Sequence, residues 1–173
     1  LKEQGDWWLS VCSTPLCTAN FGWGVEMQET EDMGVVDFAN EQFGYGLIPS
    51  ATQEEMLLMA RPEALVACAL SPTMSSCEAI LVCGARHLVH CSKATESAPF
   101  QYRGRRRIDN KDPAVIIGVD AHKAMLDLEL EVATQTLQRD INKLLVGFQA
   151  AVHVLDHASP ITFVTGAWGC GAF

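Results

Sequence analysis

Residues 35–59 decide the fold: they read Val-Val-Asp-Phe-Ala-Asn (35–40), Glu-Gln-Phe-Gly-Tyr-Gly (41–46), Leu-Ile-Pro-Ser-Ala-Thr (47–52) and Gln-Glu-Glu-Met-Leu-Leu-Met (53–59). The β-branched and aromatic residues at 35–38 predict a short strand. Pro49 excludes a helix from the loop that follows. Thr52, with Glu55 three residues later, forms a capping-box pattern, which predicts a helix starting at Gln53. We therefore expect a strand, a glycine-bearing loop and a helix with two carboxylates in its first turn.

Three further apolar runs predict strands: Ala-Ile-Leu-Val-Cys-Gly (79–84), Val-Ile-Ile-Gly-Val-Asp (115–120) and Ile-Thr-Phe-Val-Thr (161–165). The first two are continuous rather than alternating, which is typical of strands buried on both faces. Strands interleaved with helices predict an α/β layered domain, in which 35–38, 79–83, 115–119 and 162–164 are neighbours in one sheet.

Between these strands we expect further helices over 63–70, about 123–131 and about 134–146. The last of them carries four apolar residues at helical spacing, namely Leu137, Ile141, Leu144 and Leu145. Residues 85–113 are predicted to form a long, polar, Arg-rich connection, of a length that is usually functional or mobile.

The composition is that of a globular protein, with 49% apolar and 19% charged residues in a chain of 173, a length that fits one domain. No apolar run approaches the roughly 20 residues that a membrane-spanning helix needs. Seven cysteines without regular spacing indicate reduced thiols, and we expect a nuclear or cytoplasmic protein with no membrane contact.

A net charge of −9 argues against direct DNA binding, because a polyanion is repelled at long range. Arg103-Gly104-Arg105-Arg106-Arg107 is a local exception. These cations form either a solvated loop, a contact for an anionic polymer or a nuclear import signal.

Chemistry-bearing residues follow the predicted strand ends, where ligands bind in open α/β sheets. Asp37 and Asn40 end the first strand, and the chain closes on a glycine-rich loop over 165–173 whose backbone amides could approach a diphosphate. Glu54 and Glu55 point about 100° apart on a helix, so they cannot flank one scissile bond as an opposed acid and base. One of them must transfer the proton while the other holds a hydroxyl group.

The order of these elements and the residues within them resemble the catalytic domain of poly(ADP-ribose) glycohydrolase, a macrodomain-type enzyme, over about residues 33–173. The resemblance implies a macrodomain-like three-layer α/β/α fold with a mixed, mostly parallel sheet. It implies hydrolysis of the ribose–ribose O-glycosidic bonds of poly(ADP-ribose), with Glu55 as general acid/base, Glu54 holding the ribose and Asp37 lining the pocket. Residues 1–34 would be a lead-in segment, and 35–173 the domain, truncated at its C-terminus.

The resemblance also implies the substrate-binding residues. They are Asn40, Gly44, Tyr45, Gly46, Gln53, Gly166, Ala167, Trp168, Gly169, Cys170, Gly171, Ala172 and Phe173. We expect no metal and no cofactor, and the implied partners are poly(ADP-ribose), ADP-ribose and ADP-ribosylated proteins.

The chain departs from the family at three points. Tyr45 interrupts a loop that is usually three glycines, Ala167 replaces a common asparagine, and no adenine-stacking tyrosine follows Gly84. Tyr45 could cover the ribose site or replace the missing stacking ring.

Three alternatives stay open. A non-catalytic ADP-ribose-binding macrodomain and a hydrolase of single ADP-ribose groups share the fold. A metal site is suggested by His87-x-x-His90-Cys91 or His153-x-x-x-His157, but neither provides four ligands at a recognised zinc spacing.

Overall fold

A computed structural model of the chain describes residues 19–20, 22, 26–30, 34–44, 52–92, 100–107, 115–123, 129, 133–155 and 161–167. In chain order the elements are the 3₁₀ turn η1 (Met27–Glu29), β1 (Gly34–Phe38), α2 (Gln53–Ala60), the 3₁₀ turn η2 (Pro62–Ala64), α3 (Leu65–Leu70), β2 (Ile80–Cys83), β3 (Val89–Ser92), β4 (Gln101–Arg105), β5 (Val115–Val119), α5 (Thr134–Val154) and β6 (Phe163–Val164). None of the helices in these ranges is long and apolar enough to cross a membrane.

The central sheet has four strands in the order β2-β5-β1-β6. β1 runs parallel to both β5 and β6, whereas β2 is antiparallel to β5. The prediction that the four apolar runs share one mixed, mostly parallel sheet is confirmed. The expectation that 79–84 is buried on both faces is wrong, because β2 lies at the edge of the sheet and its residues are only half-buried or exposed.

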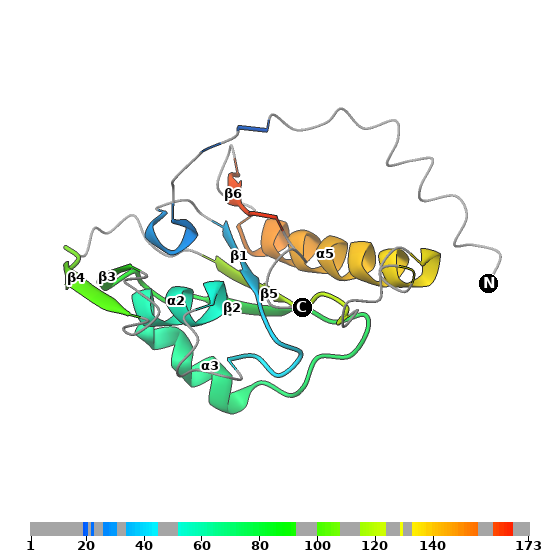
Figure 1. The fold of residues 1–173 in the computed structure, drawn as a ribbon, viewed down its shortest axis with the longest axis horizontal. Helices are drawn as coiled ribbons and strands as arrows, with labels where there is room; N and C mark the ends of the chain where they lie inside the picture. The colour runs from blue at the N-terminus through cyan, green and yellow to red at the C-terminus, as the bar shows by residue number, and fades with distance from the viewer. Residues whose placement is uncertain are drawn as a thin grey trace.

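Helices cover both faces of the sheet (Figure 1). α2 and α3 lie on one side, where Leu57 and Leu58 pack with Val35 and Ile116. α5 lies on the other side, where Ala151 packs with Val36 of β1 and with Ile117 and Val119 of β5. This is the three-layer α/β/α arrangement that the resemblance implied.

α5 continues to Val154, well past residue 146, where we expected it to end, and its buried face includes Leu144 of the predicted pattern but not Leu137 or Ile141. Leu137 and Ile141 are largely exposed, while Lys143, Gly147 and Ala151 are fully buried against the sheet. Gly147 permits this contact, because a Cβ built there would lie 2.7 Å from Ile117 Cγ2. Leu144, Phe148 and Leu155 pack on the sheet beside Ala151 at helical spacing, so an apolar stripe and the close approach at Gly147 together define the buried face.

The expected connection over 85–113 contains a second, two-stranded antiparallel sheet made of β3 and β4. This hairpin packs on α2: Leu88 N donates to Ala60 O at 2.9 Å, and Cys91 Sγ lies 3.6 Å from Met56 O. The sequence does not indicate these strands, because both are short and polar. The arginines of β4 also interrupt the alternation of apolar and polar residues that would predict a strand. The helix expected over 123–131 lies mostly outside the described residues.

Candidate active site

Gln53 joins the N-terminus of α2 to the central strand β1. Its Oε1 accepts a hydrogen bond from Phe38 N at 2.7 Å, and its Nε2 donates to Val36 O at 3.0 Å. β6 pairs only with Gly34 and Val35, so the next backbone groups of β1 on that side would otherwise lack a partner. The Gln53 amide therefore extends the ladder where β6 ends and sets the position of the following glutamates.

Glu54 holds the loop that follows β1. Its Oε1 accepts from Gly44 N at 2.6 Å, and its Oε2 accepts from Asn40 N at 3.3 Å and Asn40 Nδ2 at 3.2 Å. Gly44 has φ +75°, a conformation that favours glycine. The side chain is buried, and this burial raises the pKa of Glu54 in spite of the three hydrogen bonds, which lower it. Glu54 thus brings Asn40 and Gly44 to the first turn of α2.

Glu55 closes the capping box that the sequence predicted. Its Oε2 accepts from Thr52 N at 2.7 Å, and its side chain is buried. Glu54 and Glu55 therefore bind different segments, the loop over 40–44 and the start of α2. This agrees with the expectation that adjacent helical residues diverge.

Asp37 is fully buried in β1, opposite Gly118 of β5, and neither carboxyl oxygen has a hydrogen-bond partner among the described residues. Burial raises the pKa of Asp37 well above its ordinary value, and the charges of Glu54 and Glu55 raise it further. Asp37 is close enough to Glu54 and Glu55 to interact with them electrostatically, and burial favours the protonated form of both Asp37 and Glu54.

The start of the terminal glycine loop reaches the same edge of the sheet. β6 is parallel to β1 and pairs with its first two residues, Gly34 and Val35, so residues 165–167 come level with the second half of β1. A Cβ built on Gly166 would lie 3.4 Å from the Phe38 ring, next to Asp37 in the chain. Ala167 follows and is exposed. Tyr45, Gly46 and 168–173 lie outside the described residues, so their place in the site stays a prediction.

The sequence reasoning missed a buried ionic cluster past the end of β5. Asp120 pairs with Arg139 and, at 2.5 Å, with Lys143, both from α5; Lys143 Nζ also donates to Ser75 O at 2.6 Å. An aspartate directly after a continuous apolar strand is the signal that could have found it.

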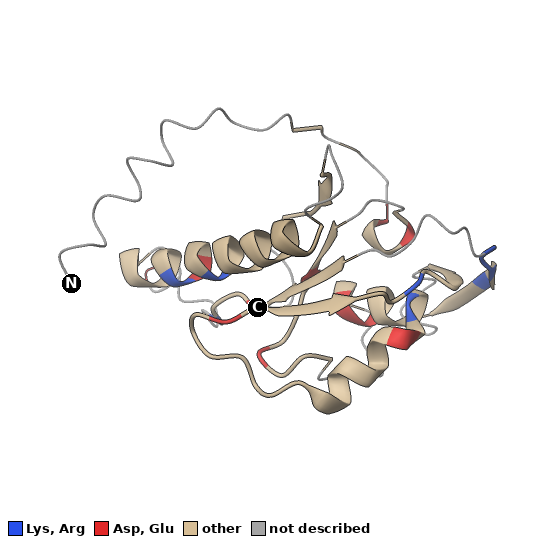
Figure 2. Ribbon diagram, turned by 180° about the vertical axis from the view of Figure 1, so that it is seen from behind, with Lys and Arg blue, Asp and Glu red and all other residues tan. Residues whose placement is uncertain are grey.

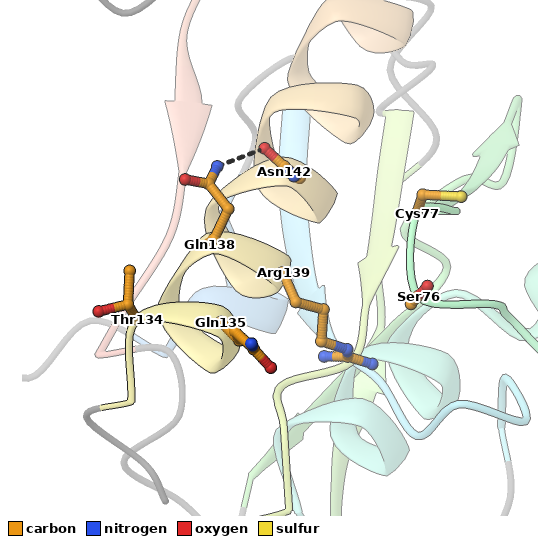
Figure 3. A pocket seen from close by; sticks show the side chains of 7 residues that line it. All are labelled: Ser76, Cys77, Thr134, Gln135, Gln138, Arg139 and Asn142. Carbon is orange, nitrogen blue, oxygen red and sulfur yellow. Dashed lines mark hydrogen bonds between the residues drawn. The ribbon is translucent and has the colours of Figure 1, made fainter. Parts of the chain in front are cut away.

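Two cavities flank this cluster and share Arg139. The larger, of about 410 Å³, is lined by Ser76, Cys77, Thr134, Gln135, Gln138, Arg139 and Asn142 (Figure 3). The smaller, of about 200 Å³, is lined by Glu41, Asp120, Ala121, His122, Lys123 and Arg139. Neither lining includes the carboxyl groups of α2 and β1.

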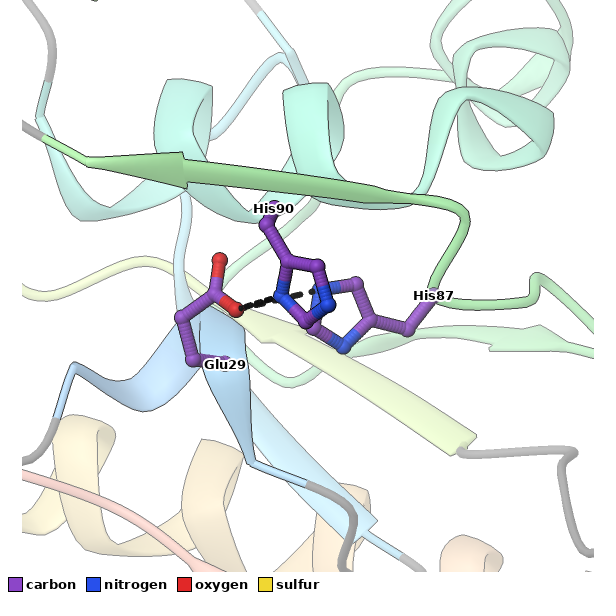
Figure 4. Close-up of side chains that lie close together, drawn as sticks. All are labelled: Glu29, His87 and His90. Carbon is purple, nitrogen blue, oxygen red and sulfur yellow. Dashed lines mark hydrogen bonds and ion pairs between the residues drawn. The ribbon is translucent and has the colours of Figure 1, made fainter. Parts of the chain in front are cut away.

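His87 and His90 come together with Glu29 of η1 and not with Cys91 (Figure 4). His90 Nδ1 lies 2.6 Å from Glu29 Oε2. Arg106 Nη1 donates to His87 Nδ1 at 2.5 Å, and a guanidinium only donates, so the His87 proton sits on Nε2 and faces Val89 O at 3.0 Å. A metal would need that nitrogen deprotonated, so these donors form a hydrogen-bond network rather than a ligand set. His153 lies near the end of α5, and His157 is outside the described residues.

Comparison with known proteins identifies relatives of the chain. Residues 9–173 match the family model described as poly(ADP-ribose) glycohydrolase (PARG), Macro domain fold. The chain is 30% identical over 164 residues to poly(ADP-ribose) glycohydrolase 2 of Caenorhabditis elegans, covering 86% of this chain and 33% of that protein. It is 31% identical over 159 residues to poly(ADP-ribose) glycohydrolase 1 of the same organism, covering 80% of this chain and 19% of that protein.

The chain thus spans a third or less of the length of these two relatives. The match to the family model covers most of the chain, and the single mixed sheet and its three layers are those expected from the sequence. The chain belongs to the poly(ADP-ribose) glycohydrolase family, with its macro domain fold.

Proposed function

We propose that this chain hydrolyses the ribose–ribose O-glycosidic bonds of poly(ADP-ribose), with Glu55 as general acid/base. The observation that carries the proposal is the meeting of three buried carboxyl groups, Asp37, Glu54 and Glu55, at the carboxyl end of β1. The names of the two relatives and the family match support the same substrate.

The proposed roles follow from what each carboxyl group already binds. Cleavage through an oxocarbenium-like state needs a proton on the leaving oxygen and an activated water. Glu54 binds the loop over 40–44 through both of its oxygens, so it positions Asn40 and the ribose rather than moving a proton. Glu55 accepts its hydrogen bond from Thr52 N within its own helix turn, and it is the group that we assign to proton transfer.

A bound substrate would bring a negative diphosphate and exclude water, and both effects favour the protonated form of a nearby carboxyl group. Burial raises the pKa of Asp37 and so favours its neutral form, which would reduce the negative charge that the substrate meets at this edge. We assign Gln53 a positioning role, because both ends of its amide are bonded to β1.

The test is the release of ADP-ribose from labelled poly(ADP-ribose). Glu55→Gln should lower the rate by about 10²–10⁴ while ADP-ribose affinity stays close to wild type, because the amide keeps the shape. Glu54→Gln should also lower the rate, but with a loss of stability that Glu55→Gln does not share, since an amide cannot accept all three donors. Glu63→Gln, at an exposed glutamate bonded to Arg86, is the control and should leave the rate unchanged. If Glu55→Gln releases ADP-ribose at the wild-type rate, the Glu55 carboxylate serves only as a helix cap and does not transfer the proton.

A second candidate is a non-catalytic ADP-ribose-binding domain. It is favoured by one observation, that Glu55 already serves the capping box through Thr52. The same assay separates the two, because a binding domain retains labelled polymer without releasing ADP-ribose. Proteins carrying single ADP-ribose groups, offered in parallel, test for hydrolysis of that linkage. The seven cysteines, an odd number without regular spacing, support a nuclear or cytoplasmic location. ADP-ribosylated proteins would be the partners there.

A further inference from the structure

The strongest concentration of positive charge lies on β4 and the two residues that follow it, away from the carboxyl groups of the site. Four of the twelve Lys and Arg residues of this acidic chain fall within 103–107, and 100–107 contains no Asp or Glu. Figure 2 shows this blue cluster at the end of the molecule formed by the β3–β4 hairpin. A local cationic surface matters in a chain of net charge −9, because it must overcome the repulsion of a polyanion by the rest of the protein.

These arginines alternate between an exposed and a half-buried side, and a β-bulge lies at the first of them. Tyr102 pairs with Cys91 and Gly104 pairs with His90, so Arg103 is an extra residue in β4 with no residue of β3 directly opposite. Bulges bend a strand and redirect its side chains. Arg106 turns inward, where it contacts His87 and is half-buried, while Arg103, Arg105 and Arg107 are exposed. Arg103 is further steered by a hydrogen bond from its Nε to Ser92 Oγ at 2.9 Å.

An exposed aromatic ring belongs to the same strand. Tyr102 is 65% exposed, although it stands in the middle of a hydrogen-bonded hairpin. Arginines spaced along a groove or edge, interleaved with aromatic rings, are the combination that binds single-stranded nucleotide polymers: the cations meet phosphates and the rings stack on bases. Each ADP-ribose unit contains both groups, a diphosphate and an adenine.

The hairpin is joined to the helix that carries the site glutamates. β3 contacts the C-terminal half of α2 through Leu88 and Ala60 and through Cys91 and Met56. α2 has eight residues, which at 1.5 Å per residue is a length of about 12 Å. The hairpin therefore lies on the order of one ADP-ribose length from Glu54 and Glu55, within reach of the neighbouring units of a chain held in the site.

We propose that Arg103, Arg105, Arg107 and Tyr102 form a docking edge for the ADP-ribose units adjacent to the one being cleaved. The proposal rests on the proposed function, because it assigns the polymer of that reaction as the ligand. Charge at an edge strand also discourages pairing with another chain. The experiment must therefore distinguish this simpler role, edge protection, from polymer docking.

The experiment compares poly(ADP-ribose) of defined length with ADP-ribose by fluorescence anisotropy at several salt concentrations. Arg103→Gln combined with Arg105→Gln should weaken polymer binding about tenfold and leave ADP-ribose binding unchanged. The slope of log K against log salt should fall by about 0.7 for each phosphate that the variant no longer neutralises, as for single strands. Tyr102→Ala should weaken polymer binding about fivefold or more, the worth of one stacked base.

Leu137→Glu combined with Ile141→Glu is the matched control. These exposed positions of α5 shift the net charge by the same two units and should leave polymer affinity nearly unchanged. Thermal unfolding of each variant confirms that it is folded. Wild-type polymer affinity and salt slope in the arginine variant would overturn the docking edge and leave edge protection as its role. Equal weakening in the α5 control would also overturn it, since general repulsion would then explain the weaker binding.

Failure of the proposed function has a different signature. A wild-type protein that binds polymer through the docking edge without releasing ADP-ribose refutes the hydrolase and supports the edge. If the wild-type protein releases ADP-ribose but its affinity for the polymer is no higher than its affinity for ADP-ribose, the hydrolase is supported and the docking edge is refuted.

Discussion

Asp37→Asn should change the dependence of stability on pH, because this carboxyl is fully buried without a hydrogen-bond partner among the described residues. Its pKa in the folded chain is raised well above the ordinary value of 3.8 by burial and by the charges of Glu54 and Glu55. Between the two pKa values the folded state binds more protons than the unfolded state. The contribution of Asp37 is therefore fully present below the unfolded pKa and is lost as the pH rises through the folded pKa.

The magnitude follows from one proton. The free energy of unfolding of the wild type should fall by up to about 1.4 kcal/mol per pH unit in this window relative to the asparagine variant. With a urea m-value of about 1–3 kcal/mol/M, this moves the midpoint difference between the two proteins by up to roughly 0.5–1.4 M per pH unit. Urea denaturation of both proteins at half-unit intervals from pH 4 upward measures it.

Glu63→Gln is the control of opposite sign. Hydrogen bonds from Arg86 lower the pKa of the exposed Glu63 to about 2, so its stabilisation is lost as the pH falls, and its exposure keeps the effect small. Parallel stability curves for wild type and Asp37→Asn across the pH range would refute the reasoning, since Asp37 would then ionise as easily in the folded chain as in the unfolded one.

Three further predictions concern packing and charge. Gly147→Val should cost about 1–3 kcal/mol in chemical denaturation, because its Cβ meets β5 at 2.7 Å, and an unchanged midpoint would show that α5 can shift outward. Lys143→Met should destabilise by about 3 kcal/mol, since it leaves Asp120 buried with one cation fewer; a stabilised variant would mean that Arg139 alone satisfies that carboxylate. Burial raises the pKa of Glu29, but the hydrogen bonds from His90 and the Cys91 amide outweigh it, so the pKa is lowered overall. The wild type should therefore lose stability as the pH falls below about 4.5, and Glu29→Gln should remove part of that loss. Equal acid sensitivity of both proteins would contradict this.

The central elements could be predicted from the sequence because their local pattern and their environment agree. The continuous apolar run of β5 is typical of a strand with neighbours on both sides, and β5 is buried throughout. The start of α2 at Gln53 follows from Thr52 and Glu55, which satisfy each other within one turn of chain. Interactions between residues three positions apart need no knowledge of the rest of the fold.

The β3–β4 hairpin and the buried face of α5 depend on the tertiary structure. β3 forms where backbone groups near Leu88 and Cys91 meet the end of α2, a contact between segments some thirty residues apart that leaves no periodic signal. On α5 the apolar residues Leu144, Phe148 and Leu155 give a sequence signal for the buried face, but the lack of a side chain at Gly147 is favourable only because β5 lies directly beneath it.

At the site, the sequence by itself determined which acids stand near strand and helix ends, and the tertiary structure decided what each of them binds. Glu54 holds the loop over 40–44, and Gln53 replaces a strand partner because β6 stops after two residues. Asp37 has no hydrogen-bond partner among the described residues, and its burial raises its pKa. Hydrogen-bond partners and desolvation are properties of neighbours in space, so residue type and spacing can name a candidate acid but cannot set its protonation state.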